Sequence, residues 1–273
     1  MTGTLCALAA IALWATLASL GVALAHVPPF LLTGLALLIG SVPSWPLARS
    51  WRIPASTLLL GVYGLFGFHF LLFVALRSAP PLEANLVNYL WPLLIVVLAP
   101  LLLPGMRLRP VHVAAAIAGF AGAALAIVGG QRIAGGLSWG YLAAAASAFV
   151  WATYSLLTQR VAHFPTAAIG LFGLVSGLLA LACHALLEPS VALTTRDWLM
   201  IVLVGLGPLG AAFFFWDAAL KRSDPRRIGL LSYLTPLAST LLLAATTGRP
   251  LTLWLALAAL LIVGAAGVGM RTR

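Results

Sequence analysis

The chain is built from long apolar segments separated by short connections that contain polar residues, proline or glycine. An α-helix needs about 20 predominantly apolar residues to cross a bilayer, because backbone groups in lipid must be satisfied within the segment itself. We therefore predict an all-α integral membrane protein with ten transmembrane helices. The expected spans cover residues 3–25, 29–47, 55–77, 82–103, 110–130, 136–158, 165–187, 198–220, 226–247 and 250–269.

The composition agrees with this interpretation. Of 273 residues, 63% are hydrophobic and 7% are charged, whereas about a quarter of the residues in soluble domains are charged. The ten spans leave no room for a separate soluble domain. The first span resembles a signal peptide, but residues 1–4 carry no Lys or Arg. Since signal peptides begin with a positive flank, we expect this segment to be the first membrane span.

The positive charge predicts the orientation of the chain. The net charge is +10, and the basic residues lie singly or in short clusters between the apolar segments. This distribution is typical of cytoplasmic loops and argues against nucleic-acid binding. Eleven Lys and Arg residues fall in connections on one side, and four fall on the other. We therefore expect a multi-pass protein of the bacterial inner membrane with both termini in the cytoplasm.

An internal repeat is visible when residues from about 131 onward are aligned with the start of the chain. Three short matches occur in the same order, the first at an offset of 137 and the other two at 144. Each match is weak alone, but the common order indicates duplication. The matches are Trp14–Thr16 with Trp151–Thr153, Ala75–Ser78 with Ala219–Arg222, and Tyr89–Leu93 with Tyr233–Leu237.

The repeat predicts two five-helix units, residues 1–130 and 131–273. Because each unit has an odd number of spans, the second must enter the membrane from the opposite side, which makes an inverted-topology repeat. Secondary transporters share this architecture, and paired proline-interrupted spans indicate their substrate sites. Pro92 in the fourth span and Pro236 in the ninth form such a pair, and we expect them to break their helices and to take part in gating.

Candidate binding residues lie next to these prolines. Asn85, Asn88 and Tyr89 share one helical face with Pro92, since positions i, i+3, i+4 and i+7 lie together. Polar side chains in a membrane helix are expected to face the protein interior. The equivalent face of the ninth span carries Ser232, Tyr233 and Pro236. The alternative is that these polar groups only form hydrogen bonds between neighbouring helices.

Three further residues lie deep within their spans. Trp14 and Trp151 occupy matching positions of the two repeats, although tryptophan in membrane proteins usually prefers the interfaces. We expect both to line a cavity; the alternative is that they face lipid. His69 lies at a similar depth to Tyr89. It is a candidate for binding a ligand carboxylate or for carrying a proton, and the alternative is a structural hydrogen bond.

The carboxylates predict no catalytic site. Glu83 follows two prolines at a helix start, where an acid complements the helix dipole. Asp217 precedes Lys221 by four residues, a spacing typical of an ion pair. The remaining three acids, Glu188, Asp197 and Asp224, are interpreted as loop residues.

Enzyme motifs are also unconvincing. Gly136–Gly140 matches the G-x-S-x-G hydrolase pattern, but it opens a membrane span instead of a strand–turn–helix. We find no nucleotide-binding loop and no metal-ligand motif. We therefore expect no enzyme activity, no cofactor and no metal.

With ten spans, a five-plus-five repeat, short loops and prolines in the fourth and ninth spans, the chain resembles the EamA-type members of the drug/metabolite transporter superfamily. Within them it resembles the aromatic amino acid exporters of bacterial inner membranes. The resemblance covers the whole chain. It implies a central cavity enclosed by the first, third, fourth, sixth, eighth and ninth helices. Its most specific parts are Ala79–Asn85, Asn88–Pro92 and Tyr233–Pro236.

Residue chemistry favours amino acids as substrates. A diphosphate-bearing ligand requires Arg or Lys in the cavity, but every basic residue lies in a connection or at a span end. Aromatic faces can hold an ammonium group, and hydroxyl, amide or imidazole donors can hold a carboxylate. We expect an exporter of amino acids that works by alternating access, with no obligate protein partner. The candidate binding residues are Trp14, His69, Asn85, Asn88, Tyr89, Trp151, Ser232 and Tyr233.

Two alternatives remain open. The first is an exporter of other small metabolites or drugs, which the same fold would serve. The second is a membrane-embedded enzyme, which would require a nucleophile and a base at a shared depth. The driving force and the oligomeric state are not determined by the residues.

Overall fold

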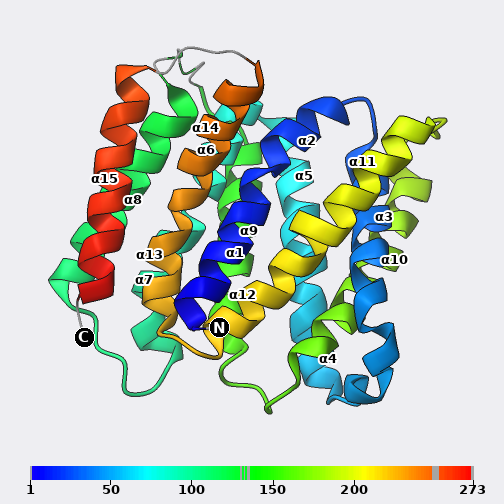
Figure 1. Cartoon of the computed structure of the whole chain (residues 1–273), viewed down its shortest axis with the longest axis horizontal. Coiled ribbons are helices and arrows are strands. Elements are labelled where there is room, and N and C mark those ends of the chain that lie inside the picture. The colour runs from blue at the N-terminus through cyan, green and yellow to red at the C-terminus, as the bar shows by residue number, and fades with distance from the viewer. Residues whose placement is uncertain (1, 130, 132, 134–135, 248–251, 272–273) are drawn as a thin grey trace.

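The structure is a computed structural model that describes residues 2–129, 131, 133, 136–247 and 252–271. All regular secondary structure in these residues is helical, and Figure 1 shows the helices packed together as one bundle. Nine segments of the described chain are long and apolar enough to cross a membrane, and a shorter apolar helix covers Leu253–Val268. The prediction of an all-helical membrane protein is therefore confirmed. The expected repeat boundary at residue 130 lies outside the described residues, as do Arg132, Arg249 and Arg273.

The helices follow one another with short connections. Those before residue 130 are α1 (Gly3–Ala15), α2 (Leu17–Ala23), α3 (Pro29–Ser41), η1 (Val42–Trp51), α4 (Ala55–Val62), η2 (Tyr63–Gly67), α5 (Phe68–Ser78), α6 (Pro81–Asn88), α7 (Trp91–Leu102) and α8 (Pro110–Val128). Those that follow are α9 (Gly140–Leu157), η3 (Thr166–Ala168), α10 (Ile169–Leu187), α11 (Thr195–Leu206), η4 (Gly207–Ala211), α12 (Ala212–Leu220), α13 (Pro225–Ser232), α14 (Leu234–Thr247) and α15 (Leu253–Arg271).

Several membrane-crossing segments are interrupted. The fourth segment breaks between α6 and α7, just before Pro92, and the ninth breaks at Tyr233 between α13 and α14, just before Pro236. Proline lacks an N–H group and clashes with the carbonyl four residues earlier, which interrupts a helix. The first segment breaks at Thr16, whose hydroxyl donates to the carbonyl of Leu13 at 2.7 Å.

The structure contains pairs of matching elements that are separated by 144 positions, the offset found in the sequence. One turn of π-helix, η2, begins at Tyr63, and a second, η4, begins 144 positions later at Gly207. The short helices α6 and α13 also begin and end 144 positions apart. A π-turn is rare and inserts an extra residue into a helix, often at a functional position. Its recurrence at the same offset is a local structural match between the two parts of the chain.

Small residues allow the closest helix contacts. A Cβ atom added to Gly177 on α10 would lie 2.9 Å from the carbonyl oxygen of Gly34 on α3. A Cβ atom on Gly122 of α8 would lie 2.7 Å from a side-chain carbon of Ile262 on α15. Close approach at small residues is typical of membrane helices, which cannot rely on the hydrophobic effect to associate. Figure 1 shows α8 and α15 side by side at one end of the bundle and α3 and α10 at the other.

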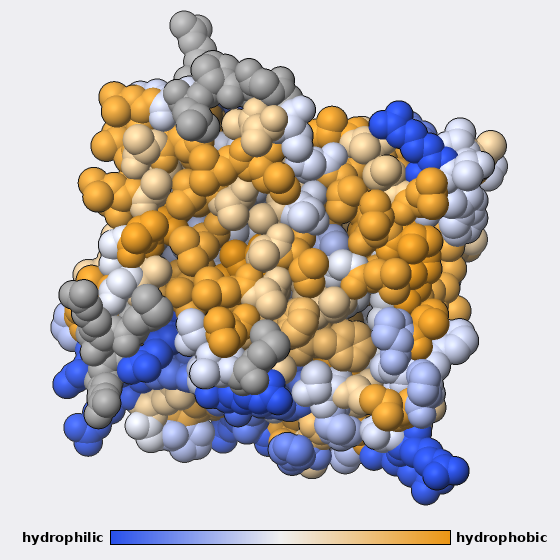
Figure 2. Space-filling view, viewed as in Figure 1, coloured by the Kyte–Doolittle hydropathy of each residue, from blue (hydrophilic) through white to orange (hydrophobic). Residues whose placement is uncertain are grey.

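The face of the molecule drawn in Figure 2 is largely apolar above a hydrophilic lower edge. Figure 2 shows a broad hydrophobic zone over the helices, with hydrophilic side chains gathered along the lower edge. The N- and C-terminal ends both lie toward this lower edge in Figure 1. Large side chains such as Leu101, Leu186 and Leu260 are more than two-thirds exposed on the helices. In a bilayer these side chains would contact lipid instead of water.

Candidate functional site

Six aromatic side chains from five helices meet in the interior of the bundle. The helices α1, α5, α7, α9 and α12 supply them. Trp151 lies in the middle, with its ring centroid 5.2–6.4 Å from those of the other five. Aromatic rings at these separations attract one another in edge-to-face and tilted arrangements. We call the set the aromatic group; it comprises Trp14, Phe68, Trp91, Trp151, Phe213 and Trp216.

The two repeated tryptophans lie in direct contact within this group. The Trp14 and Trp151 rings are 5.9 Å apart and nearly perpendicular, at 77°. The indole N–H of Trp14 donates to the carbonyl of Pro208 at 3.0 Å. Pro208 lies in the π-turn η4, so this bond joins α1 to the interrupted part of the eighth segment. Trp14 is half-buried, whereas Trp151 is buried.

His69 on α5 lies beside the aromatic group. Its ring is 6.1 Å from that of Phe213 and 5.0 Å from that of Phe68. His69 Nδ1 lies 2.6 Å from the carbonyl oxygen of Leu65 in the π-turn η2. A carbonyl only accepts, so Nδ1 carries the proton in this arrangement and Nε2 remains available as an acceptor. The side chain is half-buried, which leaves this nitrogen suited to a ligand.

The polar face of α6 divides into two kinds of residue. Asn88 is buried, and its Oδ1 accepts a hydrogen bond of 3.0 Å from the Ser147 hydroxyl on α9. For Asn88, this contact is the hydrogen bond between neighbouring helices that the sequence leaves open as the alternative to ligand binding. Asn85 and Tyr89 are half-buried, and no hydrogen bond joins their side chains to any other described residue. Asn85 and Tyr89 therefore retain polar groups that a ligand can use.

The equivalent residues of the ninth segment have a different environment. The Ser232 hydroxyl donates to the carbonyl of Gly229 on its own helix at 2.5 Å. Tyr233 is buried in a cluster formed with α8 and α15, which includes Leu237 and Ile262. A Cβ atom on Gly119 of α8 would lie 2.4 Å from the Tyr233 ring. The structure therefore does not bring Ser232 and Tyr233 to the aromatic group, because the break at Tyr233 directs this side chain toward α8 and α15.

The sequence interpretation missed several members of the aromatic group. It includes Trp91 only within the Asn88–Pro92 motif and does not single out Phe213 or Trp216. Trp216 is buried and lies 5.2 Å from Trp14, and its indole N–H donates to the Ser155 hydroxyl at 3.1 Å. The run Phe213–Trp216 is a usable signal, because Phe213 lies 144 positions after His69. The rings of His69 and Phe213, which therefore occupy equivalent positions of the two repeats, lie 6.1 Å apart.

Four of the five carboxylates lie at helix N-termini. Asp197 and Thr194 form a capping box at α11, and the Asp224 side chain accepts from the N–H of Arg226 at the start of α13. Glu83 is in the first turn of α6, as expected. Glu188 oxygens accept from the N–H groups of Phe30 and Leu31 at the start of α3. The interpretation of Asp197 as a loop residue was wrong, because it lies in the first turn of α11. For Glu188 and Asp224 it was incomplete, since each carboxylate satisfies backbone donors that a helix leaves unpaired.

Asp217 is the remaining carboxylate. It lies on α12, and its Oδ2 is 2.6 Å from Nζ of Lys221, the expected ion pair. Burial lowers the pKa of the Lys221 ammonium, although Asp217 acts in the opposite direction.

At Asp224, burial opposes ionisation, but hydrogen bonds from Arg226 outweigh it, and the pKa of Asp224 lies below its ordinary value.

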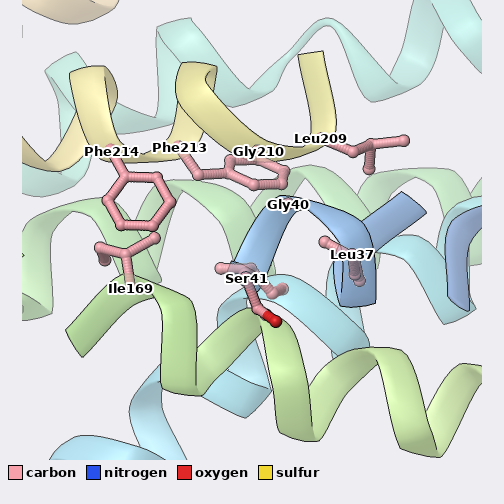
Figure 3. Close-up of a pocket in the computed structure, with 10 residues that line it drawn as sticks. Leu37, Gly40, Ser41, Ile169, Leu209, Gly210, Phe213 and Phe214 are labelled. Carbon is pink, nitrogen blue, oxygen red and sulfur yellow. The ribbon is translucent and has the colours of Figure 1, made fainter. Parts of the chain in front are cut away.

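A narrow crevice adjoins the aromatic group on one side. Figure 3 shows Leu37, Gly40 and Ser41 of α3 facing Phe213 and Phe214 of α12 across it. Its volume is about 10 Å³, far below the range of about 300–1,000 Å³ usual for small-molecule pockets. The hydroxyl of Ser41 already donates to the Leu38 carbonyl at 2.6 Å. The crevice is therefore better explained as a packing gap than as a substrate site.

The G-x-S-x-G segment has a structural contact. The Ser138 hydroxyl donates to the carbonyl of Ser78 and accepts from the N–H of Gly140 at 3.2 Å. It thus links the end of α5 to the start of α9. This hydroxyl is engaged as a helix-start contact, and a nucleophile elbow requires a strand before the serine.

Comparison with known proteins identifies the family. The model of the EamA-like transporter family matches residues 1–128 and again residues 138–269. The chain is 46% identical to the aromatic amino acid exporter YddG of Ancylobacter novellus, over 98% of this chain and 96% of that protein. It is 29% identical to the aromatic amino acid exporter YddG of Escherichia coli, over 96% and 94%.

Two further matches agree. The chain is 28% identical to a probable amino-acid metabolite efflux pump of Salmonella typhimurium, over 89% of this chain and 86% of that protein. A solved crystal structure superposes with a TM-score of 0.91 at 44% identity, covering 97% of this chain and 95% of that one. The matches span nearly the full length, and the family model covers most of the chain. This chain is a member of the EamA-like transporter family.

Proposed function

We propose that this protein exports amino acids, including aromatic ones, across the bacterial inner membrane by alternating access. The observation that carries the proposal is the contact between Trp14 and Trp151 at 5.9 Å, because it brings repeated residues of two distant segments into one aromatic group. The names of the relatives, aromatic amino acid exporters, support the same substrate class.

The proposed architecture is an inverted repeat of two five-helix units, residues 1–130 and 131–273. Matching π-turns 144 positions apart and matching breaks before Pro92 and Pro236 support it. The two separate matches to the family model, 1–128 and 138–269, have the same division. Interrupted helices in corresponding positions are typical of transporters, where they surround the substrate. In this proposal the two breaks act as the flexible points of gating.

The proposed orientation places both termini in the cytoplasm. The hydrophilic lower edge in Figure 2 is the edge toward which both termini lie in Figure 1. Arg49, Arg107 and Lys221 all lie in connections predicted to be on that side. Positive residues are retained preferentially on the cytoplasmic side of a membrane.

The proposed binding site is centred on Trp14, His69 and Trp151. The aromatic faces can hold the ammonium group and the apolar side chain of the substrate. On the α6 face, Asn85 and Tyr89 offer donors for the carboxylate, and the unprotonated Nε2 of His69 offers an acceptor for the ammonium group. Asn88, Ser232 and Tyr233 take packing roles in this proposal, because Asn88 and Ser232 bond within the protein and Tyr233 packs against α8 and α15.

The test is transport of labelled amino acids in proteoliposomes, with and without a pH gradient. Wild-type protein is expected to exchange phenylalanine and related amino acids. Trp14→Ala and Tyr89→Ala are expected to abolish this exchange while the protein stays folded. Trp198→Ala is the matched control, because Trp198 is nearly half exposed at the start of α11. Wild-type rates in the first two variants would refute the proposed site.

A second candidate function is export of other small metabolites or drugs. The mostly aromatic character of the site favours it, since such surfaces bind many apolar cations. Competition by non-amino-acid compounds for labelled phenylalanine, together with their own transport, would support this alternative. Failure of every amino acid to exchange would remove the first proposal.

A further inference from the structure

Among the side-chain carboxylates that the structure describes, Asp217 is the one that contacts no helix N-terminus. Its side chain is only 2% exposed. One oxygen, Oδ2, is bonded to the Lys221 ammonium at 2.6 Å. The other oxygen, Oδ1, is buried and forms no hydrogen bond of normal geometry within the described residues, although the Thr166 hydroxyl, 3.5 Å from Lys221 Nζ, lies beside the pair. Buried carboxylate oxygens are normally satisfied, so this free acceptor requires an explanation.

Lys221 is the only lysine in the sequence. Its ammonium also donates to the carbonyl of Phe164 at 2.8 Å and lies 3.8 Å from the centre of the Phe164 ring. Its side chain is 22% exposed, more than that of Asp217. One partner of the pair is therefore reachable from outside, and the other lies behind it.

Lys221 lines a pocket at the edge that carries the chain termini. We call this the inner pocket; its volume is about 580 Å³, and Gln159, Phe164, Lys221 and Arg222 contribute to its wall. The first turn of α1 lies against this region, since a Cβ atom on Gly3 would lie 2.1 Å from the Ser223 hydroxyl. The volume falls within the range of small-molecule sites. It is large enough for an aromatic amino acid.

The ion pair lies between the inner pocket and the aromatic group. Phe213, Trp216, Asp217 and Leu220 share one face of α12, because they follow the i, i+3, i+4 and i+7 pattern. Phe213 and Trp216 belong to the aromatic group, while Leu220 lines the inner pocket. A solute moving along this face from the pocket would meet Lys221 and Asp217 before the aromatic rings.

An amino acid carries the same two charges as this ion pair. Removing one charge of a buried pair is costly because the other is left uncompensated. A zwitterion can instead replace both partners at once, its carboxylate pairing with the lysine and its ammonium with the aspartate. Every charge remains paired during such an exchange. The free Oδ1 of Asp217 provides an additional acceptor for an ammonium group, which has three donors.

We propose that Asp217 and Lys221 form an inner recognition site for the α-ammonium and α-carboxylate groups of an amino acid arriving from the inner pocket. This inference rests on the proposed function and adds the residues that select the zwitterion. The aromatic group then receives the substrate side chain. The site requires both charges on one ligand, which distinguishes it from a general cation or anion site.

The first experiment uses the unaltered protein in detergent and measures binding of phenylalanine, phenylalaninamide and N-acetylphenylalanine by equilibrium dialysis. The two analogues each lack one of the charges. Phenylalanine is expected to bind at least tenfold more tightly than either analogue. Equal binding of all three would overturn the inference while leaving amino acid export intact. Absence of binding and of transport for every amino acid would instead contradict the proposed function.

The second experiment separates recognition from structural pairing. Asp217→Asn and Lys221→Gln are each expected to lower phenylalanine affinity at least tenfold. Arg160→Gln, which removes an exposed cation three residues after the end of α9, is the control. The double variant Asp217→Lys with Lys221→Asp keeps a pair but reverses it. We expect it to regain the melting temperature lost in the single variants without regaining affinity. Recovery of both would show that the pair is only structural and would overturn the inference.

Discussion

Glu188 provides the sharpest test of the packing on the side opposite the chain termini. Its side chain is completely buried, and its two oxygens accept from the N–H groups of Phe30 and Leu31 at 3.0 and 3.2 Å. Arg77 on α5 and His184 on α10 contact the same carboxylate at 2.9 and 3.0 Å. One carboxylate thus connects α3, α5 and α10.

Glu188→Gln removes the charge and keeps the shape. A glutamine offers one acceptor oxygen, so its amide nitrogen must face at least one of the four groups that contacted the carboxylate. Removing one partner from a buried, hydrogen-bonded charge costs about 3–5 kcal/mol. We take the lower limit, about 3 kcal/mol, since one oxygen is retained. At 1.4 kcal/mol per factor of ten, this is more than a hundredfold change in the unfolding equilibrium.

Arg77→Gln is the matched control. The Arg77 side chain is 47% exposed, and ion pairs with an exposed partner are worth about 0–1 kcal/mol. The contacts of Glu188 with the start of α3 remain in this variant. The expected loss is therefore less than 1 kcal/mol.

The assay is reversible unfolding of the purified protein in mixed micelles with increasing denaturing detergent, followed by tryptophan fluorescence. The free energy of unfolding is compared for the wild type, Glu188→Gln and Arg77→Gln. If the glutamine variant loses no more stability than the Arg77 variant, the carboxylate does not hold α3 as described, and the reasoning is refuted.

Two further predictions concern packing and orientation. Gly64→Ala is expected to destabilise the protein by about 1–3 kcal/mol, because the new Cβ atom would lie 2.2 Å from the Tyr154 ring. Gly21→Ala is the control, because Gly21 has open space around it. This variant should be neutral or slightly stabilising in the same unfolding assay. A reporter that works only in the cytoplasm should be active when it is fused after Arg273. Activity of a reporter that works only in the periplasm, fused at the same place, would contradict the proposed orientation.

Much of the architecture was accessible from the sequence. Apolar segments of membrane-crossing length predicted the helices, since the bilayer allows few other ways to satisfy the backbone. Pro92 and Pro236 predicted the two helix breaks, because the effect of proline on a helix is local. The repeat singled out Trp14 and Trp151, whose rings lie 5.9 Å apart, while their expected role in lining a cavity stays a prediction.

The direction in which each residue faces was decided only by the tertiary structure. Tyr89 and Tyr233 follow the same motif, but Tyr233 is buried against α8 and α15 while Tyr89 stays half-buried at the α6–α7 break. Trp216 belongs to the aromatic group, but the run Phe213–Trp216 does not by itself show which of its side chains faces inward. Helices in lipid are apolar on nearly every face, so the polar and apolar alternation that orients a soluble helix is absent. Contacts between neighbouring helices, made by close packing at small residues, determine which face points inward.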